Sequence, residues 1–462
     1  MQDKKNSYDI IVIGAGSAGL TAAVGASGIG AKVLLVEKHK IGGDCTHYGC
    51  VPSKALIHAS KMYDNLQDAL AYTHQVVRDI AQTETPEVLQ EHGITTVSGE
   101  ASFVGKYSIK VDDQIYSARK IIIATGSRAR ELPIKGLSKG DYLTNKTIFD
   151  VENMKSLAII GGGPIGSELS MAFARLGVAV TLIESSDRIL AREDTAAAEI
   201  VMKNMRSLGV TVLTGARTER VTVVNKQKTL EVLHQSSGKT EKVTVNEVLV
   251  AVGRQPNIEN LGLDQAEVAY TERGILVNKR GRTTNKHIYA IGDVSGPPYF
   301  THLSNHQAKV ALTHAIFKIP ARQEERVIPR VTFTDPVVAS VGLSEQQLRE
   351  SGEEFIALKK PLSEMDRAYT DDNKTGFYKI LVDKKGRILG ATLVGTAAGE
   401  LINEIALAMR HNIKITALAD TIHPYPTYGY GLRQVADLFR TQSYTPSKKK
   451  WAKRLLRLRG KS

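Results

Sequence analysis

Short apolar runs that end in glycine-rich turns predict parallel strands at two places in the chain. Residues 8–13, with the sequence YDIIVI, have the apolar character of a buried strand. A glycine-rich turn and a helix-compatible stretch to about Ile29 follow, and a second strand over residues 32–36 ends at Glu37. This order of elements predicts a strand–helix–strand unit that binds a dinucleotide.

The glycines of this first turn have separate roles in such a unit. Gly14 permits the tight turn, Gly16 lets the backbone approach a pyrophosphate, and Gly19 lets the helix pack closely on the strand. The N–H groups at the start of the helix would contact the phosphates. Glu37 would accept hydrogen bonds from a ribose hydroxyl.

The same pattern returns after residue 156. An apolar run over 157–160 leads into a turn with Gly161, Gly163 and Gly166, then a helix to about residue 176 and a strand over 179–183 that ends at Glu184. In both units the acid follows the first glycine by 23 positions. Glu184 favours NADH over NADPH, because a carboxylate binds a ribose hydroxyl and repels a 2′-phosphate, although Arg188 lies four residues further on.

The chain has two cysteines, Cys45 and Cys50, shortly after the first unit. Their spacing could close a small disulfide loop, and a helix from about Pro52 would place Cys50 near its N-terminus, where the pKa of a thiol falls. The alternative is a pair of buried cysteines that pack as small apolar residues. Next to two nucleotide-binding units we favour a redox pair. Two cysteines cannot form a four-ligand structural zinc site, and no metal site is expected.

With these motifs the chain resembles the flavin-dependent pyridine nucleotide–disulfide oxidoreductases over residues 8–440. This family includes dihydrolipoamide dehydrogenase, glutathione reductase and mercuric reductase. The resemblance implies that the first unit binds FAD and the second NADH, with NADPH less favoured. It also implies that Cys45 is the interchange thiol that meets the substrate and Cys50 the charge-transfer thiol against the flavin.

The resemblance assigns further residues to the site. Lys54 is expected near the flavin, paired with Glu168, on the side where NADH gives its hydride. Other expected contacts with the cofactors come from the second glycine of the cysteine loop, from two chain crossings between the domains and from a late aspartate that contacts the ribityl chain: Gly43, Thr125, Gly126, Gly253 and Asp293.

The fold class that follows is α/β, with two Rossmann-like domains and a C-terminal α+β dimerisation domain. The expected boundaries are an FAD-binding domain over 1–150 and 276–328, an NAD(P)-binding domain over 151–275, an interface domain over 329–441 and a basic tail over 442–462. Because the interface domain of this family completes the site of the partner subunit, a homodimer is expected.

The segment over residues 421–430 departs from the family's commonest pattern, a His-Pro-Thr run with a glutamate five positions after the histidine. One register places Tyr425 and Tyr430 at these positions, and the other places His423 and Tyr428 there, so neither gives a His–Glu pair. A tyrosine with a pKa near 10 is a poor base for a dithiol.

Mercuric reductases resemble the chain in this segment, although the chain has neither their vicinal C-terminal cysteines nor their N-terminal CxxC domain. The expected acceptor is Hg(II), another thiophilic species or a small disulfide, with dihydrolipoamide dehydrogenase as the alternative.

The formal net charge of +13 is concentrated at the C-terminus. Eight cations and no acid lie within residues 443–462, which leaves +5 on the rest, and no nucleic-acid partner is expected. As a helix this tail would align Trp451, Leu455 and Leu458 opposite the cations, a pattern that suits an anionic membrane surface or an acidic partner. The alternative interpretation of the tail is a solvated segment. A further alternative for the function of the whole protein is a membrane-docked electron-transfer flavoprotein.

The sequence also bears on the location of the protein. Without a long apolar run or a signal peptide, we expect a cytoplasmic protein, with a peripheral position at the inner membrane face if the tail docks.

Overall fold

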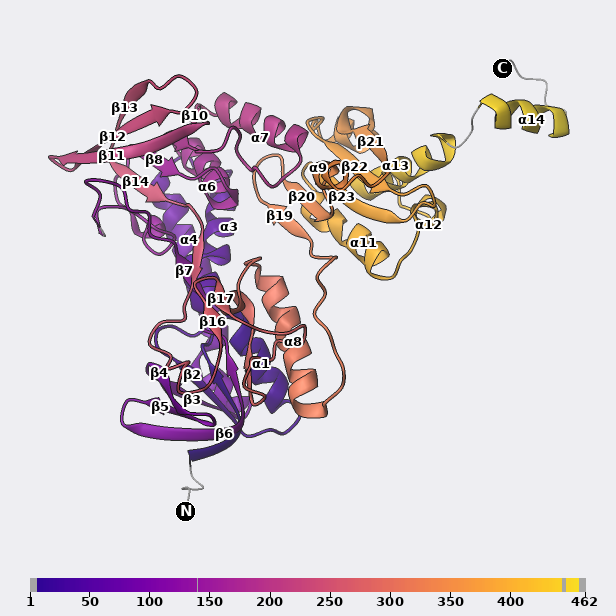
Figure 1. Cartoon of the computed structure of the whole chain (residues 1–462). Coiled ribbons are helices and arrows are strands. Elements are labelled where there is room, and N and C mark those ends of the chain that lie inside the picture. The colour runs from indigo at the N-terminus through magenta and orange to yellow at the C-terminus, as the bar shows by residue number, and fades with distance from the viewer. Residues whose placement is uncertain (1–5, 139, 443–445, 457–462) are drawn as a thin grey trace. The chain divides into compact units, whose positions relative to one another are not determined.

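The computed structural model describes residues 6–138, 140–442 and 446–456 (Figure 1). The chain divides into two compact units. The first comprises the residues up to Asp187 together with Leu208–Glu324, and the second comprises Arg188–Ser207 together with the residues from Glu325 onward. Helix α7 (Thr195–Ser207) therefore belongs to the second unit, although its sequence position is between two strands of the first.

The largest sheet of the first unit is built around strand β1 (Ser7–Ile13). Its order is β3-β2-β1-β6-β5-β4, with β18 paired to the end of β6. The strands β1, β2, β3, β6 and β18 pair in parallel, and β4 and β5 form antiparallel pairs. Their bounds are β2 Val33–Glu37, β3 Ile94–Ser98, β4 Ala101–Gly105, β5 Ser108–Val111, β6 Gln114–Ile123 and β18 Ile288–Ala290.

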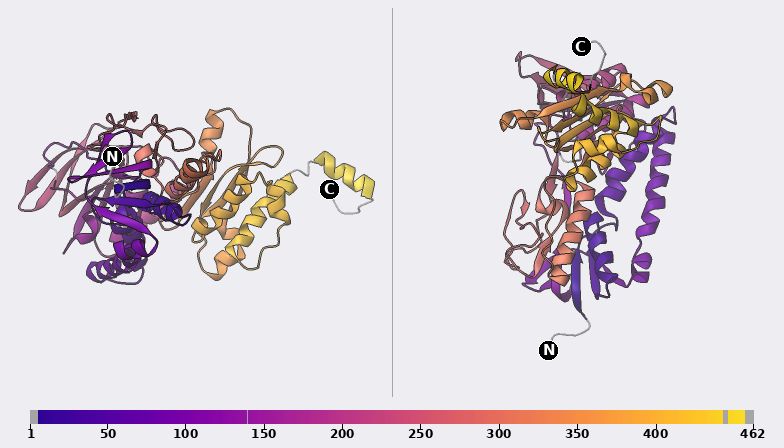
Figure 2. Two further views of the ribbon diagram at one scale, coloured as in Figure 1. Left: turned by 90° about the horizontal axis from the view of Figure 1, so that it is seen from below. Right: turned by 90° about the vertical axis from the view of Figure 1, so that its right-hand side faces the viewer.

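Both faces of this sheet are covered. Ile10 and Val12 of β1 pack in one hydrophobic core, and Ile11 and Ile13 pack in the other, as the alternation of side chains along a strand requires. This explains the continuous apolar run in the sequence. Helices α1 (Ser17–Ser27) and α8 (Thr301–Phe317) lie side by side on one face (Figures 1 and 2), where several alanines of both helices join the first core.

The second predicted strand–helix–strand unit is also present in the first unit. Strand β8 (Ser156–Ile160), helix α6 (Pro164–Arg175) and strand β9 (Ala179–Ile183) follow one another, in a parallel sheet of order β10-β9-β8-β14. A three-stranded antiparallel sheet packs beside it through Leu230 and Val232. The remaining bounds are β10 Thr211–Leu213, β14 Glu247–Val250, β11 Ala216–Val224, β12 Gln227–His234 and β13 Thr240–Val245.

The first unit contains further helices and strands. They are α2 Gly43–Tyr48, α3 Cys50–Ala59, α4 Leu66–Ala81, η2 Gln82–Glu84, α5 Pro86–Glu91, β7 Ser127–Ala129, η3 Ile148–Asp150, β15 Arg254–Pro256, β16 Tyr270–Thr271, β17 Gly274–Ile275 and η4 Gly292–Ser295. Strands β7 and β15 pair with each other, so the two expected chain crossings lie together.

The second unit is an antiparallel sheet of order β19-β20-β23-β22-β21 with helices packed on it. A buried lysine, Lys379, ties the α7 segment to this sheet through Asp194 (2.5 Å) and also contacts Glu345 (2.8 Å). The bounds are β19 Arg330–Thr332, β20 Val338–Gly342, α9 Glu345–Glu350, β21 Ile356–Pro361, η5 Leu362–Glu364, α10 Asp366–Thr370, β22 Phe377–Val382, β23 Ile388–Val394, α11 Ala398–Arg410, α12 Ile415–Asp420, α13 Tyr428–Gln442 and α14 Pro446–Leu456.

The predicted fold class is therefore confirmed. Parallel sheets flanked by helices build the first unit, and an antiparallel sheet with helices builds the second. Among the described helices, none has the length and apolarity needed to cross a bilayer.

Candidate active site

The first glycine turn has a shape that only glycine allows. Gly14 has a φ of +100°, and a Cβ there would lie 2.4 Å from the carbonyl oxygen of Ala124. A Cβ on Gly19 would lie 1.8 Å from the carbonyl oxygen of Gly14. Helix α1 begins directly after Gly16, and the first N–H groups of a helix have no partner within it. The turn therefore forms a cradle in which a pyrophosphate fits.

The second turn repeats this geometry. Gly161 has a φ of +112°, and a Cβ there would lie 2.6 Å from the carbonyl oxygen of Ala251. A Cβ on Gly166 would lie 2.0 Å from the carbonyl oxygen of Gly161. Gly163 is the N-cap of α6, as Gly16 is of α1. The chain thus contains two anion cradles of the same construction.

The acid that ends each second strand is bound to its own turn. Glu37 accepts hydrogen bonds from the backbone N–H groups of Ala15 (2.7 Å) and His39 (2.8 Å). Glu184 accepts them from Gly162 (2.6 Å) and Ser186 (2.7 Å). These bonds fix each carboxylate at the carboxyl end of its own parallel sheet, beside the glycine turn of the same unit. A nucleotide ribose lies at this place in folds of this kind.

A pocket of about 350 Å³ opens next to Glu37. Its walls come from the ends of β2 and β3 and from the loops around α2 and α5, and they include His39, His47 and Thr85. This volume is within the range of nucleotide and drug-sized pockets. The cradle, the acid and the pocket together fit the pyrophosphate, ribose and base of FAD.

The two cysteines lie where α2 gives way to α3. Cys45 is in α2, and Cys50 is the first residue of α3, two residues earlier than the sequence predicts. Both are free thiols in the structure. The hydroxyl of Thr301, the first residue of α8, donates a hydrogen bond to Cys45 Sγ at 3.4 Å and lies 3.5 Å from Cys50 Sγ. One hydroxyl therefore contacts both sulfurs.

The two thiols have opposite pKa shifts. The hydrogen bond from Cys45 lowers the pKa of Cys50 to about 6, and Thr301 and the charge of Lys54 act in the same direction. The pKa of Cys45 is raised, first by its hydrogen bond to Cys50 and then by burial. At neutral pH the reduced pair therefore holds one proton, on Cys45, and one thiolate, on Cys50.

An ion pair lies beside the thiolate. Lys54 Nζ, one turn after Cys50 in α3, is 2.8 Å from Glu168 Oε2 in α6. The Glu168 side chain is only 5% exposed, so its charge needs this partner. The structure thus brings together Cys45, Cys50, Lys54 and Glu168, which the sequence places in two separate segments.

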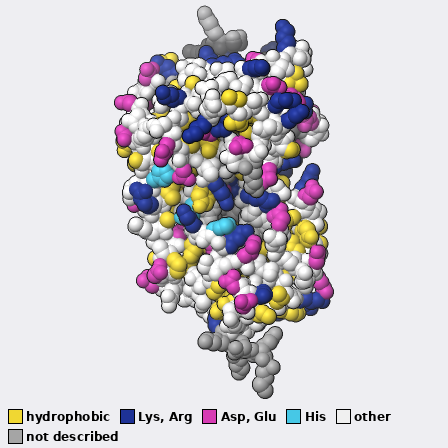
Figure 3. Space-filling model, turned by 90° about the vertical axis from the view of Figure 1, so that its left-hand side faces the viewer, with side chains coloured by type: hydrophobic (Ala, Val, Ile, Leu, Met, Phe, Trp, Pro, Cys, Tyr) yellow, Lys and Arg dark blue, Asp and Glu magenta, His cyan; other side chains and the backbone are white. Residues whose placement is uncertain are grey.

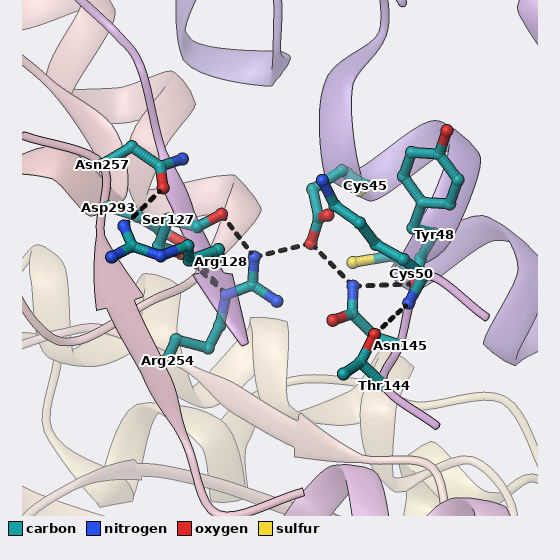
Figure 4. A network of polar contacts seen from close by, with 12 residues as sticks. Cys45, Tyr48, Cys50, Ser127, Arg128, Thr144, Asn145, Arg254, Asn257 and Asp293 are labelled. Atoms are coloured by element: carbon teal, nitrogen blue, oxygen red, sulfur yellow. Dashed lines mark hydrogen bonds and ion pairs between the residues drawn. The ribbon is translucent and has the colours of Figure 1, made fainter. Parts of the chain in front are cut away.

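A network of polar contacts joins the cysteine loop to the expected ribityl contact (Figure 4). Arg254 donates to Asp44 Oδ2 (2.6 Å) and to the hydroxyl of Ser127 (2.7 Å). That hydroxyl donates to Asp293 Oδ2 (2.5 Å). Asn145 donates to the other end of the network, at Asp44 Oδ2 (3.1 Å). Burial raises the pKa of Asp293, and the contacts with Ser127 and Arg254 oppose that shift.

The chain crossings support this network. Thr125 donates its hydroxyl to the carbonyl of Asn257 (2.8 Å), and the Asn257 amide donates back to the carbonyl of Thr125 (2.8 Å). The N–H of Asn257 bonds to the carbonyl of Gly126, and the carbonyl of Gly253 accepts from Arg130. The predicted residues Thr125, Gly126 and Gly253 therefore shape the backbone that carries Arg254.

Tyr425 lies in the second unit with two neighbours. Its hydroxyl donates to Asp366 Oδ2 (2.9 Å), and its ring contacts that of Tyr430 edge to face, with 5.5 Å between centroids. The hydrogen bond to Asp366 raises the pKa of Tyr425. Tyr425 and Tyr430, which one of the two registers aligns with the family's His–Glu pair, thus contact each other, and Tyr425 stays protonated at neutral pH.

His423 has a glutamate partner that the local motif does not contain. Its Nε2 is 3.0 Å from Glu404 Oε1 on α11, and its Nδ1 is 3.0 Å from the carbonyl oxygen of Thr421. The His423 side chain is 8% exposed. Both partners are hydrogen-bond acceptors, so the ring serves both only when both nitrogens carry protons, which leaves no lone pair for a substrate proton.

Local sequence patterns do not indicate several of these site residues. Asp44, Ser127, Asn145, Thr301 and Glu404 reach their partners only through the fold, across separations from 19 to 256 residues. One signal was available, because Asp44 places a charge directly before a redox cysteine and such a charge needs a partner. The described residues contain no group of three or more His, Cys, Asp or Glu side chains that could hold a metal ion.

Comparison with known proteins gives a consistent assignment. Residues 8–315 match the family described as pyridine nucleotide-disulphide oxidoreductase, and residues 328–436 match its dimerisation domain. A mercuric reductase of Lysinibacillus sphaericus is 33% identical over 455 residues, which cover 94% of this chain and 83% of that protein. A dihydrolipoyl dehydrogenase of Geobacillus stearothermophilus is 35% identical over 452 residues, which cover 93% and 96%.

A solved structure is also similar over nearly its whole length. The Cu(II) complex of the HOCl-induced flavoprotein disulfide reductase RclA from Escherichia coli has a TM-score of 0.88 and 29% sequence identity. The match covers 94% of this chain and 99% of that one. The names of these relatives differ in the acceptor that they state.

Proposed function

Because the chain belongs to the pyridine nucleotide-disulphide oxidoreductase family, whose members bind FAD and use NAD(P)H, we propose that it passes electrons from NADH through Cys45 and Cys50 to a thiophilic metal ion such as Hg(II). The observation that carries this proposal is the thiol pair, in which a thiolate and a thiol share the hydroxyl of Thr301. FAD, when bound, supplies the relay of two electrons between hydride and disulfide.

The residues that would hold FAD follow from the geometry of the first unit. The turn of Gly14, Gly16 and Gly19 would bind the pyrophosphate, and Glu37 would bind the ribose. Asp293, held by Ser127, would bind the ribityl chain. Gly43 has a φ of +63° and approaches Gly16 so closely that a Cβ would meet it at 2.7 Å, so it keeps this entry open to the cofactor.

The second unit of the same kind would bind the nicotinamide nucleotide. Glu184 is fixed by two backbone hydrogen bonds and presents its carboxylate where the ribose hydroxyls lie. Arg188 donates instead to the carbonyls of Glu193 (2.9 Å) and Ala191 (2.8 Å). Because the guanidinium of Arg188 is engaged by these two carbonyls, the Glu184 carboxylate decides the preference, and NADH is favoured over NADPH.

Metal reduction requires both sulfurs in a defined protonation state. Reduction of the disulfide leaves a Cys50 thiolate and a Cys45 thiol, and a thiophilic cation displaces the remaining proton when both sulfurs ligate it. Two electrons then pass from the sulfurs to the metal. This converts Hg(II) to Hg(0) and re-forms the disulfide. Similarity to mercuric reductases and to a disulfide reductase whose structure is that of its Cu(II) complex supports a metal ion as the acceptor.

Dihydrolipoyl dehydrogenase is the second candidate, and the His423–Glu404 contact favours it. A base that accepts a proton from a dithiol is usually a histidine oriented by a carboxylate. Here, however, the imidazole is nearly buried and both of its nitrogens are engaged. Tyr425 is protonated at neutral pH and cannot replace it. The metal acceptor therefore remains our first choice.

A homodimer would complete the site, because the matched dimerisation domain carries Tyr425. In that assembly the tyrosine of one subunit would lie near Cys45 of the other. Light scattering on the FAD-bound protein should give twice the chain mass of 50.3 kDa.

One pair of assays tests the acceptor. NADH oxidation by the FAD-bound protein is measured with Hg(II) and an excess of a small thiol, and NAD⁺ reduction is measured with dihydrolipoamide. We expect saturable turnover with Hg(II), lost in Cys45→Ser, and little turnover with dihydrolipoamide. The reverse ranking would replace this proposal by the second candidate. Matched activity of Cys45→Ser and the unsubstituted protein would remove the thiols from the reaction.

A further inference from the structure

Helix α14 (Pro446–Leu456) presents large apolar side chains to water. Trp451, Leu455 and Leu456 are 67%, 61% and 62% exposed. Trp451 and Leu455 are four residues apart, so they lie on one face of the helix. Elsewhere in the second unit, side chains of this kind form the core of the sheet and its helices. The exposed row on α14 belongs to no described hydrophobic core.

Cations occupy the other face of α14. At 100° per residue, Lys453, Lys450 and Arg454 lie at about 200°, 260° and 300° around the helix from Trp451, whereas Leu455 lies at about 40°. The helix contains two further lysines and no acidic residue. Three more cations follow in the sequence, outside the described residues. The helix is therefore amphipathic, with all its charges of one sign.

The rest of the protein does not share this excess. Eight of the net thirteen positive charges come from the last twenty residues. On the face drawn in Figure 3, cationic and acidic side chains are interspersed. The positive charge is thus coupled to the one helix that exposes a tryptophan and leucines.

We propose that α14 binds an anionic lipid surface, lying parallel to it with Trp451 and Leu455 at the boundary of the acyl chains and the lysines and arginine against the phosphates. A helix of 11 residues is marginally stable alone in water, and burial of its apolar face at an interface would stabilise it. An acidic nucleic acid would use the cations but not the apolar row. A lipid surface accounts for both faces, and tryptophan is enriched at such interfaces.

The binding should be reversible and sensitive to salt. Each lysine or arginine near an anionic membrane strengthens binding by about fivefold, and this contribution falls as the Debye length shortens. The helix alone is short, so the cations supply a large part of the affinity. Reversal of three of them should weaken binding by at least about 100-fold.

Trp451 provides the readout, because it is the only tryptophan of the chain. The full-length, FAD-bound protein is mixed with vesicles of phosphatidylcholine alone or with phosphatidylglycerol added. We expect co-sedimentation and a shift of tryptophan emission to shorter wavelength with the anionic vesicles only. Both signals should fall when salt is raised.

Two charge-reversed variants with the same change in net charge separate the helix from the general charge of the protein. The test variant carries Lys450→Glu, Lys453→Glu and Arg454→Glu. The matched control carries three exposed substitutions in β13 and in the turns that join β11, β12 and β13, namely Lys226→Glu, Lys239→Glu and Lys242→Glu. The proposal predicts that only the first variant, and a chain ending at Gln442, lose vesicle binding.

The outcomes that overturn the proposal are equally distinct. Equal vesicle binding by the chain ending at Gln442, or an unshifted emission with anionic vesicles, would exclude a lipid role for α14. An emission shift with polyglutamate or DNA but not with vesicles would assign the helix to an acidic macromolecule instead. Activity with NADH and Hg(II) is measured on every sample, so failure of the proposed function is seen separately from failure of lipid binding.

Discussion

Asp44 and Arg254 are 210 residues apart in the sequence, and 2.6 Å separates Oδ2 of the first from Nη2 of the second. The ion pair joins the residue before Cys45 to a strand that also contacts Ser127 and Asp293. The position of the cysteine loop and the position of an expected FAD contact are therefore set by one guanidinium.

Substitution of Arg254 should destabilise the protein in a pH-dependent way. Arg254→Ala leaves Asp44 and Asp293 without their cation, and we expect a loss of about 1–3 kcal/mol in the free energy of unfolding at pH 7, with weaker FAD retention. Arg217→Ala is a control, because it removes an exposed pair with Glu219 and should cost less than about 1 kcal/mol. Urea denaturation of the FAD-bound proteins measures both.

The sign of the pH effect follows from Asp293. Its pKa is raised in the folded protein, so between the unfolded and folded pKa values the folded state binds more protons, and stability falls as pH rises through that window. Removal of Arg254 raises the pKa of Asp293 further. The deficit of the variant should therefore be larger at pH 7 than near pH 4, and a deficit that grows on acidification would contradict this assignment.

Thr301 should control the ionisation of the charge-transfer thiol. Its hydroxyl lowers the pKa of Cys50, which lies at about 6, so thiolate absorbance in the reduced enzyme should develop as pH rises through that value. Thr301→Val should move the midpoint upward by about one pH unit, the effect of one hydrogen bond to a charged sulfur. Thr301→Ser keeps the hydroxyl and should restore the midpoint. An unchanged midpoint in the valine variant would show that Thr301 only packs.

Glu184 should determine the choice of nicotinamide nucleotide. We expect kcat/KM to be higher for NADH than for NADPH, and Glu184→Ala should lower that ratio by about 10-fold or more, because it removes a charged acceptor of ribose hydrogen bonds. The corresponding acid of the other unit is the control, since Glu37→Ala should weaken FAD retention and leave the ratio alone. A preference for NADPH in the unsubstituted protein would refute the role of Glu184.

Tyr425 should act on the acceptor and not on the flavin. Tyr425→Phe removes the hydroxyl that bonds to Asp366, and turnover with Hg(II) should fall by about 10-fold, the value of one hydrogen bond. Flavin reduction by NADH, followed by stopped flow, should be unchanged. Tyr369→Phe, at another exposed tyrosine of the second unit, serves as the control. Unchanged turnover in the Tyr425 variant would restrict that residue to packing.

The sequence predicted the two nucleotide-binding units because their determinants are local. Apolar runs, glycines that avoid backbone clashes and a terminal acid occur within about thirty residues, and the observed strands agree with the predicted ones to within a residue or two. The start of α3 at Cys50 instead of Pro52 is the kind of difference that helix ends usually show.

The contacts that shape the site could not be predicted in the same way. Arg254 meets Asp44, Thr301 meets the two sulfurs and Glu404 meets His423 only after distant segments pack together. Residues 421–430 contain no glutamate that could pair with His423, because its partner, Glu404, comes from a neighbouring helix. Local spacing carries no information on such pairs.

In the proposed reaction Cys50 is the low-pKa thiolate beside the flavin, and Cys45 is the thiol that meets the acceptor. The most direct test is the long-wavelength absorbance of two FAD-bound variants before and after anaerobic addition of NADH. Cys45→Ser should show the charge-transfer band even in the oxidised protein, because Cys50 cannot then form a disulfide. Cys50→Ser should be yellow when oxidised, bleach when NADH reduces the flavin, and lack the band in both states. A band in Cys50→Ser, or none in Cys45→Ser with FAD retained, would show that Cys50 is not the charge-transfer thiol.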